Sequence, residues 1–504
     1  MNLEQALQDW FGYSSFRYDQ KEIIESVLNG HDTLAVMPTG SGKSICYLLP
    51  SKLTEGLTVV VSPLVSLMED QVMQLRAEGY KHVAHLSSML QYEEKKELLK
   101  GISRLDVLYL SPEMLQKPEV KSVLGSYKIA MFVIDEAHCI SQWGHEFRTD
   151  YLKLGTVIRS LGHPVTLALT ATATEDVRED IVRQLGMNDP VSFVSTMNRN
   201  NIFMEMTFCE TEGEKQKALK KAVQEGEGPV IVYCGTRSDT EAYSEFMRYH
   251  GTDAHPYHGG MSKEDRLLIQ QQFFYDQIQA VCATNAFGMG INKTNIARII
   301  HLHVPSSVEQ YIQEIGRAGR DGRQSEVKLF WTDQDVKLPV WMVESEFPEE
   351  ARMDQLSAFF TESDHQSVDP AVSFIPENQR KMVTHYLKAY GVIDEQNRIL
   401  PPRKRINDIL MDIKKHFQLR QIEKMKQVRE MHQLIGEADC IRNGLMNYFS
   451  EQPHEKPRYC CSRCQEDRPV IRSEQTVEPN YRNIQINWQD RLYWKLTGEA
   501  KFHE

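Results

Sequence analysis

The chain has 504 residues, of which 41% are apolar and 25% charged, and its net charge is −12. This composition is ordinary for a soluble globular protein, and the length predicts about three domains. No apolar run approaches the roughly 20 residues that a membrane-spanning helix needs, and the first residues do not form a signal peptide, so we expect a cytoplasmic protein without a membrane partner. The negative net charge would repel nucleic acid, so any such partner must be held by local basic patches.

Aromatic, arginine and glutamine side chains stand shortly before the first glycine-rich turn. Tyr13, Arg17 and Gln20 precede a helical pattern that contains Ile23 and Val27. Such residues can hold a purine, Tyr13 and Arg17 by stacking and Gln20 through its amide. Core aromatics beside a surface arginine are the other interpretation of the same residues.

A phosphate-binding loop follows directly. Thr33 to Met37 predicts a short apolar strand, the next residues predict a turn, and a helix is expected from Lys43. Glycines let successive N–H groups point into one cavity, where Lys43 would reach the outer phosphates of ATP and Ser44 would ligate Mg²⁺. The pattern G-x-x-x-x-G-K-[ST] fails only at its first position, Met37, which leaves an ordinary glycine-rich turn as the alternative. The predicted nucleotide-binding residues of the loop are Thr39, Gly40, Ser41, Gly42, Lys43 and Ser44.

Two carboxylates end a second strand of the same domain. Ile129 to Ile134 is a continuous apolar run, typical of a buried parallel strand, and Asp135 and Glu136 follow it. Asp135 would hold Mg²⁺, and Glu136 would orient and deprotonate the attacking water. The phosphate loop in the same domain favours this interpretation over a solvated strand end.

Apolar strands alternate with helices as far as about residue 335, which predicts an α/β fold of parallel sheets with crossover helices. Function is then expected at the carboxyl ends of the strands. The second half of this region has no phosphate loop, but Arg317 and Arg320 lie beside glycines and could stabilise charge on the γ-phosphate from across a cleft. An arginine-rich surface helix is the alternative. The expected strands are Thr33 to Met37, Leu57 to Val61, Val107 to Leu110, Ile129 to Ile134, Val165 to Leu169, Val230 to Tyr233, Ala280 to Ala283 and Ala297 to His303.

These motifs, in this order, resemble those of superfamily 2 helicases. The phosphate loop, Asp135 to His138, Thr170 to Thr172 and Gln313 to Arg320 carry that resemblance. More narrowly, Ala137 to Arg148 resembles the aromatic-rich loop of RecQ-type DNA helicases, and Phe11 to Gln20 resembles the adenine motif of that family.

The resemblance covers roughly residues 8–335 and implies two RecA-like lobes, 1–200 and 201–335, that move 3′ to 5′ on single-stranded DNA. It implies that Arg320 is the arginine finger and Arg317 its companion. It also implies that a group of residues beside the carboxylates senses single-stranded DNA and couples its binding to hydrolysis, which agrees with the tendency of aromatics interleaved with arginine to stack on bases. This group is His138, Trp143, Phe147 and Arg148.

The pattern changes beyond residue 335. Residues 336–402 predict a linker with a small helical region. The strongly acidic residues 344–364 within it predict either a linker or an acidic surface helix. Arg403 to Arg429 holds nine basic and three acidic residues on an amphipathic helical pattern. A solvated helix face and a contact with DNA phosphates are both compatible with it.

Four late cysteines predict a structural Zn²⁺ site within residues 403–470. Cys440, Cys460, Cys461 and Cys464 resemble the ligands of the RecQ zinc subdomain, but the family spacing C-x-x-C-x-x-C is not kept. We favour Cys460 as the fourth ligand, with Asp467 or His454 as alternatives, and unbound reduced thiols are the other interpretation. The tail 471–504 is too short for the winged helix and small helical domain that often follow in the family.

The sequence therefore predicts a monomeric helicase that uses ATP and Mg²⁺, carries Zn²⁺, and acts on single-stranded and partially duplex DNA in repair, recombination or replication. Replication and repair proteins such as a single-strand-binding protein are its candidate partners. An RNA helicase is one alternative. A DNA-stimulated translocase or scaffold with little unwinding is another, because no wing is evident.

Overall fold

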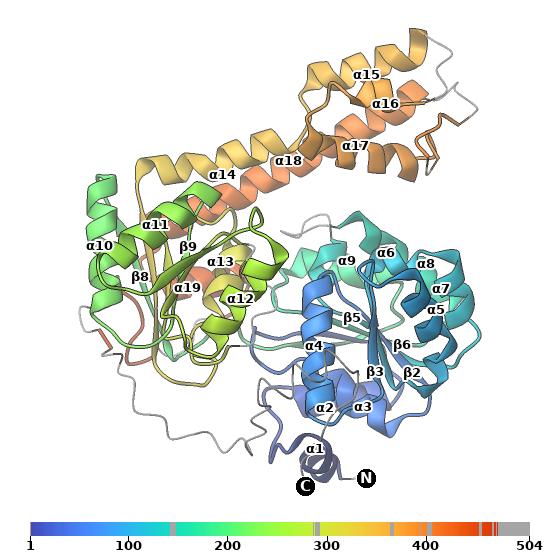
Figure 1. Ribbon diagram of the computed structural model, residues 1–504, viewed down its shortest axis with the longest axis horizontal. Helices are drawn as coiled ribbons and strands as arrows, with labels where there is room; N and C mark the ends of the chain where they lie inside the picture. The colour runs from blue at the N-terminus through green and yellow to red at the C-terminus, as the bar shows by residue number, and fades with distance from the viewer. Residues whose placement is uncertain are drawn as a thin grey trace.

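Two parallel β-sheets form the centres of two lobes, and a helical arm and a small cysteine-containing module complete the molecule (Figure 1). The computed structural model describes residues 2–141, 148–285, 287, 293–362, 367–394, 396–400, 406–452, 456–465, 468–469 and 471. The predicted fold class is confirmed: two RecA-like lobes precede a mainly helical C-terminal region. None of the described helices is long and apolar enough to pass through a bilayer.

Lobe 1 contains a seven-stranded sheet in the order β3-β4-β2-β5-β6-β1-β7, and all its pairings are parallel. Helices cover both faces, so most of the strands are buried on both sides and appear in the sequence as unbroken apolar runs. The strands are β1 (Thr33–Val36), β2 (Leu57–Val61), β3 (Val83–Leu86), β4 (Val107–Leu110), β5 (Ile129–Ile134), β6 (Val165–Thr170) and β7 (Val191–Val194). The helices are α1 (Leu3–Phe11), α2 (Gln20–Leu28), α3 (Ile45–Leu53), α4 (Val65–Ala77), α5 (Tyr92–Lys100), α6 (Pro112–Leu115), α7 (Pro118–Leu124), α8 (Leu154–Ser160) and α9 (Glu175–Leu185).

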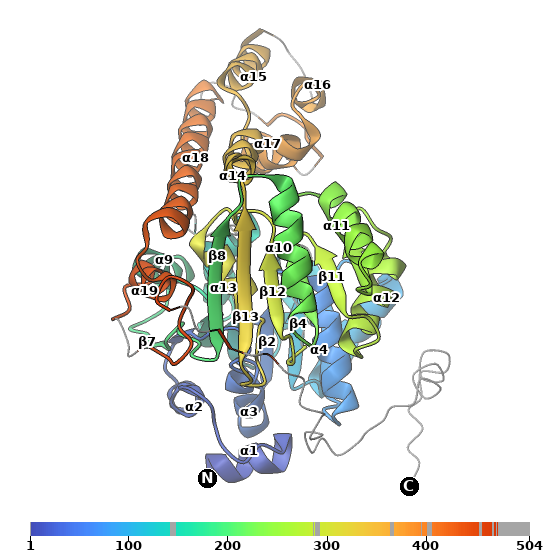
Figure 2. The same cartoon turned by 90° about the vertical axis from the view of Figure 1, so that its left-hand side faces the viewer.

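Lobe 2 contains a six-stranded parallel sheet in the order β10-β11-β9-β12-β13-β8, seen face-on in Figure 2. Its strands are β8 (Ile202–Phe208), β9 (Val230–Tyr233), β10 (Ala254–Tyr257), β11 (Ala280–Ala283), β12 (Arg298–His301) and β13 (Ser325–Trp331). Its helices are α10 (Glu212–Gln224), α11 (Arg237–Tyr249), α12 (Lys263–Phe274) and α13 (Val308–Ile315).

All eight predicted strands are confirmed to within two residues at each end, but β3, β7, β8, β10 and β13 were not predicted. Strand β13 was missed because it is buried yet carries Glu326 and Lys328. These charges are satisfied inside the sheet: Lys328 Nζ lies 3.1 Å from Glu205 of β8, and Arg298 Nε lies 2.9 Å from Glu326. Buried charges are tolerated when they are paired, but a sequence pattern does not show the pairing.

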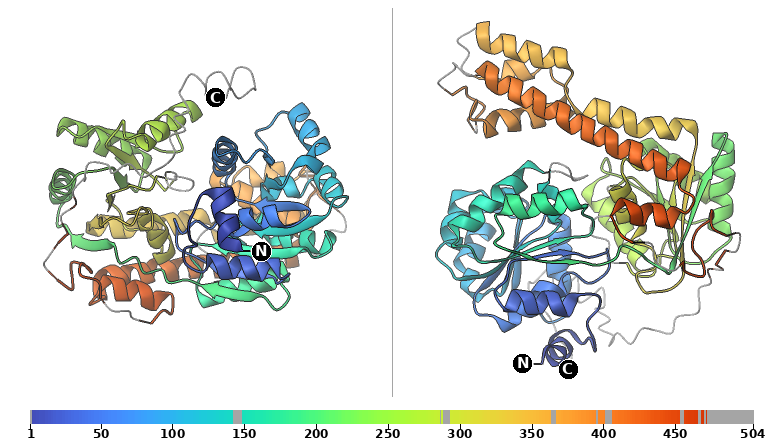
Figure 3. Two further views of the ribbon diagram at one scale, coloured as in Figure 1. Left: turned by 90° about the horizontal axis from the view of Figure 1, so that it is seen from below. Right: turned by 180° about the vertical axis from the view of Figure 1, so that it is seen from behind.

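The C-terminal region forms an arm that projects from lobe 2 over lobe 1 (Figure 1 and Figure 3, right). Its axis is the 32-residue helix α18 (Ile406–Glu437), and its outer part has a separate apolar core that includes Leu356, Leu387 and Ile413. Helix α19 (Ile441–Tyr448) then brings the chain back to lobe 2. The other helices of the arm are α14 (Asp333–Glu346), α15 (Glu350–Glu362), α16 (Asp369–Val372) and α17 (Glu377–Ala389).

Two basic residues of α18 are paired with the acidic stretch that precedes them in the chain. Lys414 Nζ lies 2.6 Å from Glu350 and 3.1 Å from Asp354, and Lys424 pairs with Glu346. These ion pairs favour an intramolecular role for Lys414 and Lys424 over a DNA contact.

Candidate nucleotide site between the lobes

The phosphate loop lies between β1 and α3 and has the backbone that the sequence predicts. Gly40 and Gly42 have φ values of +81° and +80°, a region that side-chain-bearing residues rarely adopt. Gln20 fixes the loop, because its Nε2 donates to the carbonyl oxygens of Ser41 at 2.9 Å and Gly42 at 3.1 Å. The loop is thus held open by a side chain of α2.

Two of the predicted adenine residues, Tyr13 and Arg17, lie on the surface beside this loop, whereas Gln20 is buried. Tyr13 is 51% exposed and Arg17 is exposed, so neither belongs to the core. The backbone N–H of Arg17 donates to Gln20 Oε1 at 2.9 Å, which joins the adenine segment to the phosphate loop. Contact of these three side chains with adenine stays a prediction.

The carboxylates Asp135 and Glu136 lie at the carboxyl end of β5. Burial and the neighbouring charge of Glu136 raise the pKa of Asp135, whereas the positive charge of Lys43 opposes that rise. Lys43 and Asp135 thus interact electrostatically across the site, as a shared metal–nucleotide site requires. Glu136 has a φ of +49°, an uncommon conformation for a residue with a side chain and one that often marks a functional turn.

The DNA-coupling residues are only partly described. His138 is buried, and its Nδ1 lies 2.9 Å from Thr170 Oγ1 at the end of β6, which links the carboxylate strand to the Thr170 to Thr172 motif. Arg148 donates from a guanidinium nitrogen to the carbonyl of Pro63 at 2.8 Å. Trp143 and Phe147 lie outside the described residues, so their predicted stacking on bases stays a prediction.

Lobe 2 approaches the phosphate loop through the segment that follows α13. A Cβ atom placed on Gly40 would lie 2.8 Å from Cγ of Arg320, and one placed on Gly316 would lie 2.1 Å from Thr39 Oγ1. Burial, together with repulsion from Arg317 and Arg199, lowers the pKa of Arg320, so an anion beside it would be strongly favoured. Arg317 is only 4% exposed, which excludes the alternative of an arginine-rich surface helix.

The four late cysteines come together between α19 and the chain that follows. Their Sγ atoms all lie within 4.8 Å of one another, with 3.7 Å from Cys440 to Cys460 and 3.4 Å from Cys461 to Cys464. Four thiolates at tetrahedral Zn²⁺ have Zn–S bonds of about 2.3 Å, which corresponds to S–S separations of about 3.8 Å. The donor set and its spacing therefore fit zinc, with Cys460 in the fourth place. His454 and Asp467 lie outside the described residues.

Comparisons with known proteins agree with this geometry. Residues 17–180 match the DEAD/DEAH box helicase family, and residues 214–322 match the helicase conserved C-terminal domain. The chain is 40% identical over 495 residues to the probable ATP-dependent DNA helicase RecS of Bacillus subtilis, which covers 97% of each chain. The chain belongs to the RecQ family.

Other members of the RecQ family match over the two lobes. The ATP-dependent DNA helicase RecQ of Haemophilus influenzae is 41% identical over 336 residues, covering 66% of this chain and 53% of that protein. The chain thus spans about half the length of that relative. Among solved structures, helicase Lhr of Mycobacterium smegmatis bound to ssDNA and AMP-PNP has a TM-score of 0.54 and 18% identity, with 76% of this chain and 57% of that chain covered, a likeness in fold.

Sequence reasoning missed residues that join the parts of this RecQ-family site. Arg199 donates to the carbonyl of Gly316, and Asn201 donates to the carbonyl of Gly319, each more than 115 positions later in the chain. Arg442 donates to the carbonyl of Ile202, and Glu451 accepts from the N–H of Met197, each about 240 to 255 positions earlier in the chain. Every residue has a backbone carbonyl and almost every residue has a backbone N–H, so the partner position needs no particular side chain. A sequence motif therefore cannot reveal these hydrogen bonds.

Proposed function

We propose that this RecQ-family protein is an ATP-dependent DNA helicase that moves 3′ to 5′ along single-stranded DNA and unwinds duplex DNA. The observation that carries the proposal is the contact of Arg320 with Gly40, because it makes one nucleotide site from two lobes. Closure around ATP and opening after hydrolysis then form a two-state cycle. The name of the relative RecS, a probable ATP-dependent DNA helicase, supports DNA as the substrate.

Each group at the site has a distinct role in hydrolysis. Lys43 and the loop N–H groups bind the phosphates of ATP, and Ser44 and Asp135 would hold Mg²⁺, which neutralises charge on the phosphate oxygens when bound. Glu136 orients the attacking water and takes its proton. Arg320, assisted by Arg317, stabilises the negative charge that develops on the transferred phosphoryl group.

Binding of DNA is coupled to this chemistry through the loop that begins at His138. The contact of His138 with Thr170 links the end of β5 to the end of β6. A movement of the loop when single-stranded DNA binds would therefore be transmitted to Glu136, which lies at the same end of β5. Trp143 and Phe147 stack on bases, and Arg148 keeps the base of the loop on lobe 1 through Pro63.

The remaining parts support the motor. Residues 1–200 and 201–335 are the two lobes, 336–402 belong to the arm, and 403–470 carry a structural Zn²⁺ held by Cys440, Cys460, Cys461 and Cys464. The proposed protein acts as a monomer on cytoplasmic DNA, together with single-strand-binding or repair proteins.

The test combines ATP hydrolysis and strand separation. Steady-state hydrolysis is measured with and without single-stranded DNA for the wild type and for Trp143→Ala, and unwinding is compared on duplexes with a 3′ overhang, a 5′ overhang or an RNA loading strand. Strong stimulation by DNA that Trp143→Ala abolishes, with unwinding only from the 3′ overhang, is the expected result. Stimulated hydrolysis without unwinding would favour a translocase, and preference for the RNA strand would favour an RNA helicase.

A further inference from the structure

The interlobe segment, residues 195–202, joins β7 of lobe 1 to β8 of lobe 2 and is bound on both sides. On the lobe 1 side, Ser195 Oγ donates to Asp19 Oδ2 at 2.5 Å. Asp19 directly precedes Gln20, whose amide holds the phosphate loop. The start of the segment is therefore fixed relative to the phosphate loop.

The C-terminal module, which consists of α19 and the cysteine-containing chain around it (Cys440 to Cys464), binds the segment through two charged side chains. Glu451 accepts hydrogen bonds from Thr196 Oγ1 at 2.6 Å and from the N–H of Met197 at 2.8 Å. Arg442, two residues after Cys440, donates to the carbonyl oxygens of Arg199 at 3.0 Å and Ile202 at 2.6 Å. Hydrogen bonds that involve a charged group are the stronger ones, so the path of this segment depends on the module.

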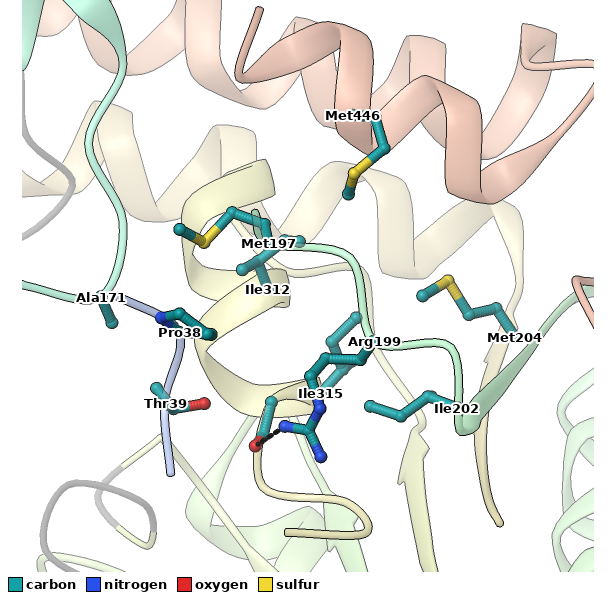
Figure 4. A pocket seen from close by; sticks show the side chains of 11 residues that line it. Pro38, Thr39, Ala171, Met197, Arg199, Ile202, Met204, Ile312, Ile315 and Met446 are labelled. Atoms are coloured by element: carbon teal, nitrogen blue, oxygen red, sulfur yellow. Dashed lines mark hydrogen bonds between the residues drawn. The ribbon is translucent and has the colours of Figure 1, made fainter. Parts of the chain in front are cut away.

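Arg199 extends from this fixed backbone to the segment that carries the arginine finger. Its guanidinium donates to the carbonyl oxygens of Gly316 at 3.3 Å, Ala318 at 3.1 Å and Gly319 at 2.7 Å, and Figure 4 shows the first of these bonds beside Ile315. Arg320 is the next residue after the last of these carbonyls. A rigid planar fork with several donors suits three carbonyls of one turn in a way that a lysine ammonium does not.

The position of Arg199 has an electrostatic cost that a purely structural contact would avoid. Its positive charge is one of the causes that lower the pKa of Arg320, and burial lowers the pKa of Arg199 itself. The two half-buried guanidiniums repel each other, so the arrangement is most favourable when an anion such as the γ-phosphate joins them. A site that accepts this repulsion is organised for the nucleotide-bound state.

We infer that Arg199 is a positioning residue that holds Arg320 in its place for ATP hydrolysis, and that the C-terminal module sets this position through Arg442 and Glu451. The inference rests on the proposed function, because Arg320 acts as the arginine finger there. It assigns the module a role in ATP turnover that is separate from any contact with DNA.

The experiment uses the full-length protein in single and paired variants. kcat and KM for ATP are measured with and without single-stranded DNA for Arg199→Ala, Arg199→Lys, Arg320→Ala and the double variant Arg199→Ala/Arg320→Ala. Binding of a non-hydrolysable ATP analogue, zinc content and thermal unfolding are measured on the same samples. The matched control is Arg248→Ala, because Arg248 also donates to a backbone carbonyl, that of Ala254 at 2.7 Å, but does so at β10, the opposite edge of the lobe 2 sheet from β8.

We expect Arg199→Ala to lower kcat by about 50-fold or more, a part of the 10³ to 10⁵ that an arginine finger provides, while analogue affinity and zinc content stay within about threefold. Arg199→Lys should recover a part of kcat, and Arg248→Ala should change nothing. In the Arg320→Ala background, Arg199→Ala should have less than about a twofold effect, since a residue that acts through another loses its effect when that residue is absent.

Three results would overturn the inference. The first two are an unchanged kcat in Arg199→Ala and full multiplication of the two effects in the double variant. A loss of kcat that is matched by lost analogue binding, lost zinc or early unfolding in both Arg199 variants would also overturn it. If single-stranded DNA does not change the rate of hydrolysis by the wild type, the proposed function is overturned instead. The effects of the Arg199 and Arg320 variants on kcat can still be compared in that case, because they are measured without DNA as well.

Discussion

The two lobes have the same strand order, yet within the described residues the loops after their first strands differ. After β1, Gly40 and Gly42 turn the backbone with positive φ, and helix α3 begins with its first N–H groups directed toward the loop. After β8, the strand of lobe 2 that corresponds to β1, the chain leads into α10, and Thr211 Oγ1 accepts from the N–H of Glu214 at 3.2 Å. The N–H of Glu210 donates to the Glu214 side chain at 2.9 Å, so N–H groups at this helix start are satisfied within the chain.

This difference shows that the fold only positions a loop at the carboxyl edge of the sheet. The residues of that loop determine whether it can bind a phosphate. The turn after α13 of lobe 2 brings Arg320 to Gly40 of the other lobe. In the proposed mechanism the lobes therefore have unequal shares: lobe 1 binds the nucleotide, and lobe 2 completes the site through this turn.

Removing one cation from each lobe gives the largest contrast. Lys43→Ala should lower the kcat for ATP hydrolysis at least about 1000-fold, because the outer phosphates lose their cation. Arg237→Ala, at the first residue of α11 in lobe 2, should leave DNA-independent hydrolysis within about threefold, because the proposed site uses no phosphate contact from the chain that follows β9. Equal losses in the two variants would show that the two lobes do not differ in this way.

A methyl group at Gly40 tests the contact between the lobes. Gly40→Ala would force a residue into φ +81° and push against the Arg320 side chain, so kcat should fall about 100-fold. Gly79→Ala is the matched control, since Gly79 has φ +92° with no atom within 4 Å of the added Cβ. It should cost about 1 kcal/mol of folding free energy and leave kcat unchanged. A kcat for Gly40→Ala as high as that for Gly79→Ala would show that the contact between Gly40 and Arg320 does not contribute to hydrolysis.

Removal of one cysteine tests the metal assignment. Cys460→Ser should lower bound zinc from about one per chain toward zero after dialysis against a chelator. Cys209→Ser, a buried cysteine outside the cluster, should keep the zinc. Elemental analysis of both proteins measures this, and full zinc in Cys460→Ser would remove Cys460 from the ligand set.

The smallest effect concerns stability and pH. The raised pKa of Asp135 means that its ionised form is disfavoured by the fold, so folding free energy is lost as pH rises through that pKa. Asp135→Asn should therefore be more stable than the nucleotide-free wild type at about pH 8 by about 1 to 3 kcal/mol, and this gain should shrink toward about pH 5. Thermal unfolding at both pH values measures it, and a gain that is larger at low pH would contradict the stated cause.

The site of lobe 1 could be predicted from sequence because its signals are local. Gly40, Gly42 and Lys43 stand together, and Asp135 ends an apolar run that can only be a buried strand. The turn carrying Arg320 was likewise recognisable from its neighbours in sequence. The adjacent pair Cys460 and Cys461 departs from the usual spacing, and only the folded turn shows all four sulfurs together.

The remaining features depend on pairings through space. Strand β13 contains Glu326 and Lys328, and charged residues argue against a buried strand. The strand is buried because Arg298 pairs with Glu326 and Glu205 pairs with Lys328, and the sequence does not show these pairs. Arg199 resembles any surface arginine in sequence, since its partners are carbonyl oxygens. The acidic stretch before α18 was compatible with a linker or an acidic surface helix, and the structure shows α14 and α15 there. Its pairing with α18 could not be predicted, because Lys414 lies more than 60 positions from Glu350.

The affinity for a transition-state analogue tests the shared site most directly. ADP with aluminium fluoride mimics the transferred phosphoryl group, and groups that act only in the transition state strengthen its binding relative to ADP. The wild type should bind this analogue at least about 100-fold more tightly than ADP, and Arg320→Ala should lose that preference while its ADP affinity stays within about threefold. A preference that survives in Arg320→Ala would show that lobe 2 does not complete the nucleotide site.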